Sequence, residues 1–108
     1  IGTRQYSGTG GQSDTAVGAQ EAYDGKGKSI IACHATKKGG ELSSIVPTLP
    51  EGTAVTLHRS NADYIVTEYG IAPLRGRTVR ERVHNLINIA APNFREDLRT
   101  QAQEVGYL

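Results

Sequence analysis

Residues 62–90, with the sequence ADYIVTEYGIAPLRGRTVRERVHNLINIA, change from a strand pattern to a helix pattern within one short stretch. Residues 62–70 are typical of a strand that ends at Gly70, and residues 71–77 show no regular pattern. Thr78 and Glu81 have the spacing of a capping box, in which two side chains satisfy free backbone groups at a helix start. Apolar residues then recur at helical spacing, at Val79, Val83, Leu86, Ile87 and Ala90. The stretch therefore predicts a strand followed by an amphipathic helix.

A second helix is predicted beyond Pro92, which interrupts the first one. Asn93 and Glu96 offer a related N-terminal cap to this helix. Its apolar face would consist of Phe94, Leu98, Ala102 and Val105. Gly106 is a typical residue for the C-terminal stop of a helix. We therefore expect two consecutive helices at the end of the chain.

Upstream of residue 62 the patterns are shorter. Residues 1–13 are expected to be extended and to end in a glycine-rich loop, and residues 14–23 to form a helix capped by Ser13 or Asp14. Residues 29–35, 45–49 and 53–59 are predicted strands, with a loop or hairpin tip at 36–44. Cys33 is expected in the core. This order predicts an α/β fold, with a mainly buried sheet and flanking helices.

Composition excludes several classes of protein. The chain has 108 residues, 37% hydrophobic content, a mean hydropathy of −0.41 and a net charge of +1. No apolar run approaches the roughly 20 residues of a membrane helix, and the charge argues against bulk nucleic-acid binding. One cysteine allows no intrachain disulfide, and the three histidines lack metal-ligand spacing. We expect a cytoplasmic protein without a metal site, and a piece of a longer polypeptide because the first residue is Ile1.

The glycine-rich loop Ser7–Asp14, SGTGGQSD, is a candidate binding site. It lacks the Lys-Ser/Thr pair of a P-loop, and Ser13 stands where G-x-G-x-x-G requires its third glycine. Two explanations remain open. The glycines serve a turn that needs positive φ, or they let a ligand approach the backbone at a helix N-terminus.

Charged residues give further candidates. Glu68 lies at the end of a predicted strand, where it is either paired for structural reasons or part of a site. Residues 74–82 carry four arginines against one acid, which suits a solvated helix face or a contact with phosphate or RNA. Lys37 and Lys38 precede Gly39-Gly40 in a basic tip, which is either an exposed loop or a phosphate contact.

Three phrases together resemble one family: GTRQYSGTGGQSD, KSIIACHATKKGGELSSIVPTLPEGTAVT and ADYIVTEYGIAPLRGRTVRERVHNLINIAAPNFREDLR. They are similar to the C-terminal part of the acetyl-CoA hydrolase/transferase family, and most similar to its 4-hydroxybutyrate CoA-transferases. The resemblance implies the C-terminal portion of a CoA-transferase-type α/β domain over residues 1–108. It also implies a glutamate nucleophile in a motif upstream of the glycine loop, which this chain does not contain.

The resemblance assigns supporting roles to five residues. Gly10 and Gly11 match the glycine pair whose backbone N–H groups face the reacting acyl or carboxylate oxygen, with Gln12 beside them. Glu68 matches the second carboxylate of the T-E-x-G motif and is expected to orient groups in the active site, not to attack. Lys38 resembles a region along the path of coenzyme A.

The implied reaction transfers coenzyme A between an acyl-CoA and a short carboxylic acid through a glutamyl-CoA thioester. Coenzyme A is then a substrate, and no permanently bound cofactor is expected. The expected partners are the substrates, the rest of the same polypeptide and further copies of it. Two alternatives stay open: an acetyl-CoA hydrolase, in which water replaces the acceptor acid, and a non-catalytic acyl-CoA-binding domain.

Overall fold

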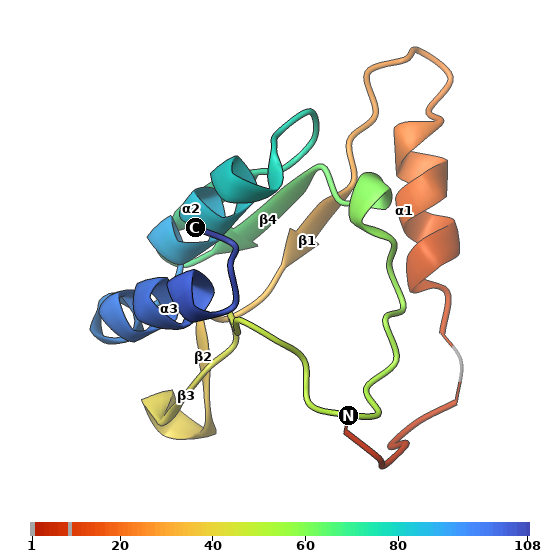
Figure 1. The fold of residues 1–108 in the computed structure, drawn as a ribbon. Coiled ribbons are helices and arrows are strands. Elements are labelled where there is room, and N and C mark those ends of the chain that lie inside the picture. Colours follow the sequence, from red (N-terminus) through yellow and green to blue (C-terminus); the bar gives the residue numbers. More distant parts are fainter. Residues whose placement is uncertain (1, 9) are drawn as a thin grey trace.

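A computed structural model describes residues 2–8 and 10–108. Figure 1 shows a small mixed α/β structure with a central sheet between helices. The elements in chain order are α1 (Gln12–Gln20), β1 (Ile30–Ala32), β2 (Thr36–Lys37), a 3₁₀ turn (Lys38–Gly40), β3 (Leu42–Ser43), a second 3₁₀ turn (Arg59–Asn61), β4 (Tyr64–Thr67), β5 (Gly70–Pro73), α2 (Val79–Asn88) and α3 (Pro92–Glu104). The predicted α/β class is confirmed.

The main sheet has three strands in the order β1-β4-β5. β1 and β4 are parallel, with Ile31 opposite Ile65, and β4 and β5 are antiparallel, with Ile65 opposite Ala72. The prediction of a mainly buried sheet is wrong for β1, because this strand lies at an edge and Ile30 is 61% exposed. β2 and β3 form a separate antiparallel hairpin, which confirms the predicted hairpin tip at 36–44.

Residues 70–73 form β5, although the sequence predicted an irregular segment there. The β4–β5 hairpin is closed by the pair Thr67 and Gly70, so that Glu68 and Tyr69 form its turn. Gly70 has a φ of 143°, which side chains rarely allow, and this turn therefore requires glycine. Pro73 is tolerated because β5 is an edge strand.

The predicted capping box at the start of α2 is confirmed. The Thr78 hydroxyl accepts a hydrogen bond from the Glu81 N–H at 3.2 Å, and the Glu81 carboxylate accepts one from the Thr78 N–H at 2.7 Å. The Thr78 N–H lowers the pKa of Glu81 because it stabilises the ionised carboxylate. Local signals therefore fix the start of α2.

The start of α3 differs from the prediction. Pro92 is the first helical residue and Ala91 is the N-cap, whereas Asn93 lies inside the first turn. Proline is favoured there because the first N–H of a helix has no internal partner. Gly106, with φ of 83°, ends the helix as predicted, and the Tyr107 N–H donates to the Ala102 carbonyl at 2.9 Å.

The core lies between the sheet and the C-terminal helices and consists largely of small residues. One cluster contains Ala62, Ala72, Leu74 and Ile89, and the other contains Ile87, Ala90 and Leu98. α2 and α3 lie on one side of the sheet and α1 lies on the other (Figure 1). The predicted apolar stripe is buried at Ile87 in α2 and at Ala90, which lies just beyond the helix, but Val79 at the start of the helix is exposed.

Two predicted strands, 45–49 and 53–59, are absent from the described residues. Pro47 lacks an N–H for a ladder, and Val55 is 72% exposed, so neither segment pairs. Residues 53–56 instead hold the N-terminal segment, since Thr53 accepts a hydrogen bond from the Gly2 N–H at 2.7 Å. Cys33 is exposed, which corrects its placement in the core.

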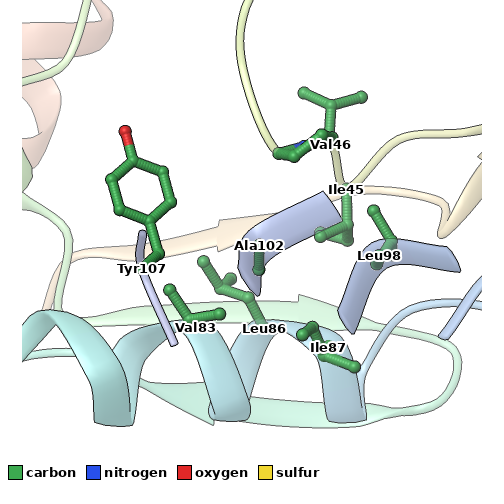
Figure 2. Close-up of a pocket in the computed structure, with 9 residues that line it drawn as sticks. Ile45, Val46, Val83, Leu86, Ile87, Leu98, Ala102 and Tyr107 are labelled. Carbon is green, nitrogen blue, oxygen red and sulfur yellow. The ribbon is translucent and has the colours of Figure 1, made fainter. Parts of the chain in front are cut away.

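An apolar cavity of about 170 Å³ lies between α2, α3 and residues 45–47. In Figure 2 the side chains of Leu86, Ile87 and Leu98 surround it, and the Tyr107 hydroxyl points away from it. Its lining offers no charged group to a carboxylate or a phosphate. We therefore assign this cavity to core packing.

Candidate functional site

Glu68 lies in the tight turn between β4 and β5, at the carboxyl end of β4. Thr67, the residue before it, is buried and donates its hydroxyl to the Ile89 carbonyl at 2.6 Å. The same hydroxyl accepts a hydrogen bond from the Tyr69 N–H at 3.1 Å. The turn that presents Glu68 is therefore fixed to the segment between α2 and α3.

Tyr69 adds a second anchor to this turn. The Arg95 guanidinium of α3 lies over the Tyr69 ring, 5.7 Å from its centroid. Arg95 also donates through Nε to the Ala90 carbonyl at 2.9 Å. Thr67, Tyr69 and Gly70 thus each stabilise the turn that carries Glu68, whereas the side chain of Glu68 is partly exposed.

The Glu68 carboxylate contacts the segment that follows β1. The Ala35 N–H donates to Oε1 at 2.6 Å, and His34 Nδ1 lies 3.4 Å from Oε2. The hydrogen bond from Ala35 lowers the pKa of Glu68, and His34 lowers it further. Glu68 is therefore held in its ionised form at the carboxyl ends of two parallel strands.

Cys33 adjoins this group. Burial raises the pKa of the Cys33 thiol, and the negative charge of Glu68 raises it further. The thiol is thus kept protonated and is a poor nucleophile. Sequence reasoning missed the contacts of His34 and Ala35 with Glu68, because they join residues that are about 33 positions apart in the chain.

The glycine loop leads directly into α1. Gly11 is the N-cap of α1 with φ of −102°, and no side chain caps this helix. The predicted cap by Ser13 or Asp14 is wrong, since both residues lie inside the helix. Among the described residues, no hydrogen bond from protein atoms reaches the first N–H groups of α1.

Neither Gly10 nor Gly11 is required by the fold of the described chain. Neither has a positive φ, and a Cβ at either position would meet no atom within 4 Å. This excludes the positive-φ explanation for the pair. By contrast, a Cβ at Gly27 would overlap the Ala19 carbonyl oxygen. The backbone at Gly10 and Gly11 is therefore accessible to a ligand at the N-terminus of α1.

The other predicted site residues lie apart from one another. Gln12 Oε1 accepts a hydrogen bond from the Thr56 hydroxyl at 2.6 Å. Lys38, with φ of 52°, lies at the tip of the β2–β3 hairpin and is exposed. Figure 1 shows this hairpin and the glycine loop on different sides of the sheet. Within residues 2–8 and 10–108, no hydrogen bond or ion pair joins either of them to Glu68.

The arginine-rich segment is partly structural. Arg82 donates to the carbonyls of Arg59 and Arg77, and Arg75 lies 3.9 Å from the buried Asp63. Asp63 also accepts hydrogen bonds from the Ser29 N–H at 2.8 Å and the Gln20 amide at 2.9 Å. Asp63 therefore joins α1, β1 and β4, which the sequence did not indicate.

Neither a metal-binding cluster nor a membrane-spanning helix is found in the part of the chain that the structure describes. No cluster of three or more His, Cys, Asp or Glu side chains is arranged to hold a metal ion there. No helix among these residues has the length and apolar character to cross a bilayer.

Comparisons with known proteins give one consistent answer. Residues 1–102 match the family described as acetyl-CoA hydrolase/transferase C-terminal domain. The chain is 49% identical over 98% of its length to a succinyl-CoA:cyclohexane-1-carboxylate CoA transferase of Geobacter metallireducens, covering 24% of that protein. It is 50% identical over 94% of its length to a 4-hydroxybutyrate coenzyme A transferase of Clostridium kluyveri, covering 23% of it.

A solved structure agrees. The crystal structure of a 4-hydroxybutyrate CoA-transferase from Porphyromonas gingivalis superimposes with a TM-score of 0.75 at 42% identity, over 91% of this chain and 23% of that one. The fold is thus an α/β domain of the CoA-transferase type. The chain belongs to the acetyl-CoA hydrolase/transferase family and carries residues of its C-terminal domain. It spans about a quarter of the length of the curated relatives it matches.

Proposed function

We propose that this chain is part of a CoA-transferase that moves coenzyme A between an acyl-CoA, such as acetyl-CoA, and a short carboxylic acid, such as 4-hydroxybutyrate. The support is membership of the family and identity of about half to relatives that are named CoA-transferases. The names of those relatives contain different acids. We therefore propose a class of acceptor, the short carboxylates, and not one particular acid.

The proposed reaction is covalent and proceeds in two halves. A glutamate carboxylate outside this chain attacks the thioester carbonyl, the C–S bond breaks, and an acyl-glutamyl anhydride and a CoA thiolate form. The thiolate attacks the glutamyl carbonyl, which releases the acyl group as a carboxylate and leaves a glutamyl-CoA thioester. The acceptor acid then reverses these steps, so that the glutamate is regenerated and no water is consumed.

One observation carries the role of this chain: neither Gly10 nor Gly11 has a positive φ, and neither has a neighbour that an added Cβ would meet in the described residues. A ligand can therefore reach their backbone, and it meets the uncapped N-terminus of α1. Attack on a carbonyl builds negative charge on oxygen, which N–H groups at a helix start stabilise. In this proposal Gly10 and Gly11 donate to that oxygen, and Gln12 lies beside the substrate.

Glu68 has a supporting role in the proposal. Its carboxylate is held ionised by the Ala35 N–H and lies in an anchored turn, which suits a group that orients others. Lys38, an exposed cation at a hairpin tip, would contact a phosphate of coenzyme A. The remainder of the polypeptide would supply the nucleophile and bring these separate positions around one substrate.

The complete enzyme tests the proposal. Acetyl-CoA is incubated with a panel of short acids, and new acyl-CoA species and free thiol are measured separately. We expect new acyl-CoA to form only with an added acid, without net thiol release. Thiol release without any acid would identify an acetyl-CoA hydrolase, in line with the hydrolase part of the family's description. Binding of coenzyme A without either product would identify a non-catalytic acyl-CoA-binding protein.

The proposal carries further expectations. Coenzyme A acts as a substrate and not as a resident cofactor, and the enzyme assembles as a homo-oligomer in the cytoplasm. Size-exclusion chromatography with light scattering of the complete enzyme measures the assembly, and a monomer at all concentrations would contradict it.

A further inference from the structure

His34 and Ala35 hold the two carboxylate oxygens of Glu68 separately. The Ala35 N–H lies 2.6 Å from Oε1, and His34 Nδ1 lies 3.4 Å from Oε2. The Ala35 N–H is the largest cause of the lowered pKa of Glu68, and the backbone N–H of Glu68 itself also lowers that pKa. The His34 contact adds a partner on the other oxygen, so that each carboxylate oxygen has a neighbour from the segment after β1.

The backbone that carries His34 is fixed on both sides. The Cys33 N–H donates to the Val66 carbonyl at 3.0 Å, which extends the pairing of β1 with β4. Ala35 is fully buried, and its carbonyl accepts from the Ser44 N–H at 2.8 Å. His34 is therefore presented to Glu68 by rigid neighbours, although its own side chain is 92% exposed.

The other groups around Glu68 do not replace this contact. Cys33, from the same segment, is a protonated thiol whose pKa is raised by burial and by Glu68 itself. Arg95, from α3, is directed at the Tyr69 ring and the Ala90 carbonyl. Among the described residues, His34 provides the side chain that touches the Glu68 carboxylate.

We infer that His34 is a positioning residue, which orients the Glu68 carboxylate for CoA transfer. This inference rests on the proposed function, in which Glu68 supports the reaction. The effect of His34 on the reaction passes entirely through Glu68, so that removal of both side chains should cost no more than removal of Glu68 alone.

The test uses the complete enzyme with His34→Ala, His34→Asn and, as the matched control, His84→Ala on the exposed face of α2. For His34→Ala we expect kcat to fall about tenfold, the factor of one hydrogen bond, with KM for acyl-CoA within about twofold. Asparagine can place an N–H near the position of Nδ1, and we expect it to restore most of kcat. The control should keep wild-type kcat.

A second readout does not depend on activity. The titration of the Glu68 carboxyl, followed by ¹³C NMR, should move to higher pH in His34→Ala, because a contact that lowers its pKa is lost. The acidic limb of the kcat profile should move in the same direction. Wild-type kcat and titration in His34→Ala, or no recovery with asparagine, would overturn the inference. Absence of CoA transfer by the wild type would instead overturn the proposed function, and the NMR shift would still decide the contact.

Discussion

Replacement of Gly11 by alanine distinguishes a glycine needed for a ligand from one needed for the fold. Gly11 has φ of −102°, and an added Cβ would meet nothing within 4 Å. Alanine is a poorer N-cap, at about 1 kcal/mol. It also restricts the unfolded chain, which offsets about 0.4–1 kcal/mol of that cost. The net change in the free energy of unfolding should therefore stay within about 1 kcal/mol.

Turnover should respond differently. If the Gly11 backbone contacts the developing oxyanion, a methyl group at this position obstructs the approach and weakens a preorganised donor. Loss of one such donor costs about 3 kcal/mol, or about a hundredfold in kcat. The assay is steady-state CoA exchange between acetyl-CoA and a short acid, together with thermal unfolding of the same Gly11→Ala sample.

Gly27→Ala is the matched control for a structural glycine. A Cβ at Gly27 would overlap the Ala19 carbonyl oxygen and lie 2.5 Å from the Ala22 Cβ, so the end of α1 must shift. We expect a loss of about 3 kcal/mol or more in stability. The reasoning on Gly11 is refuted if Gly11→Ala unfolds as Gly27→Ala does, or if it keeps wild-type turnover.

Three further predictions concern the acidic residues and the thiol. Glu68→Gln in the complete enzyme should lower kcat while leaving the melting temperature near that of the wild type, because its side chain is exposed; a large loss of stability would assign Glu68 to the fold. Glu68→Gln should also speed alkylation of Cys33 by iodoacetamide, because it removes a charge that raises the thiol pKa; an unchanged rate would contradict that coupling. Asp63→Ala should cost about 2 kcal/mol, since it leaves the Ser29 N–H without its partner. Burial raises the pKa of Asp63, but the hydrogen bonds to its carboxylate outweigh this and lower the pKa overall. The stability that the ionised Asp63 contributes is therefore present above the pKa of the unfolded state. It is lost as pH falls through the pKa of the folded state. The stability difference between the wild type and Asp63→Ala should therefore shrink in acid, and a constant difference would argue against an ionised Asp63.

Local signals in the sequence predicted the presence of the three α-helices, but they gave the correct start only for α2. The Thr78–Glu81 capping box and Gly106 act within one turn of chain, and both occur where they were predicted. The predicted break between two helices at Pro92 is confirmed, but the predicted cap at Asn93 was wrong, because proline can either interrupt a helix or begin one. Which of the two occurs depends on the backbone conformation of the residue before the proline. Here that residue, Ala91, is the N-cap, and Pro92 begins α3.

Strand pairing depends on distant partners and was predicted less well. β5 looks irregular in sequence, but it pairs with β4 because Gly70 allows the tight turn. Residues 53–59 have a strand-like composition and yet form no ladder, since their side chains hold the N-terminal segment instead. β-branched composition indicates an extended backbone, but it does not say whether a neighbouring strand exists.

The candidate site shows the same division. Glu68 and the glycine pair could be singled out from short motifs, and the structure explains why Gly70 follows Glu68. The contacts of His34 and Ala35 with Glu68 could not be predicted, because they depend on the parallel register of β1 and β4. The placement of Lys38 and Gln12 around a substrate stays a prediction, because no hydrogen bond or ion pair among the described residues joins either of them to Glu68.

Location of the covalent intermediate tests the central claim most directly. The complete enzyme is incubated with acetyl-CoA, the adduct is reduced with borohydride, and the modified peptide is identified by mass spectrometry. We predict a reduced glutamate outside residues 1–108, formed also by the Glu68→Gln variant. A modification at Glu68, or no adduct in an enzyme that exchanges CoA, would contradict the supporting role of this chain in covalent CoA transfer.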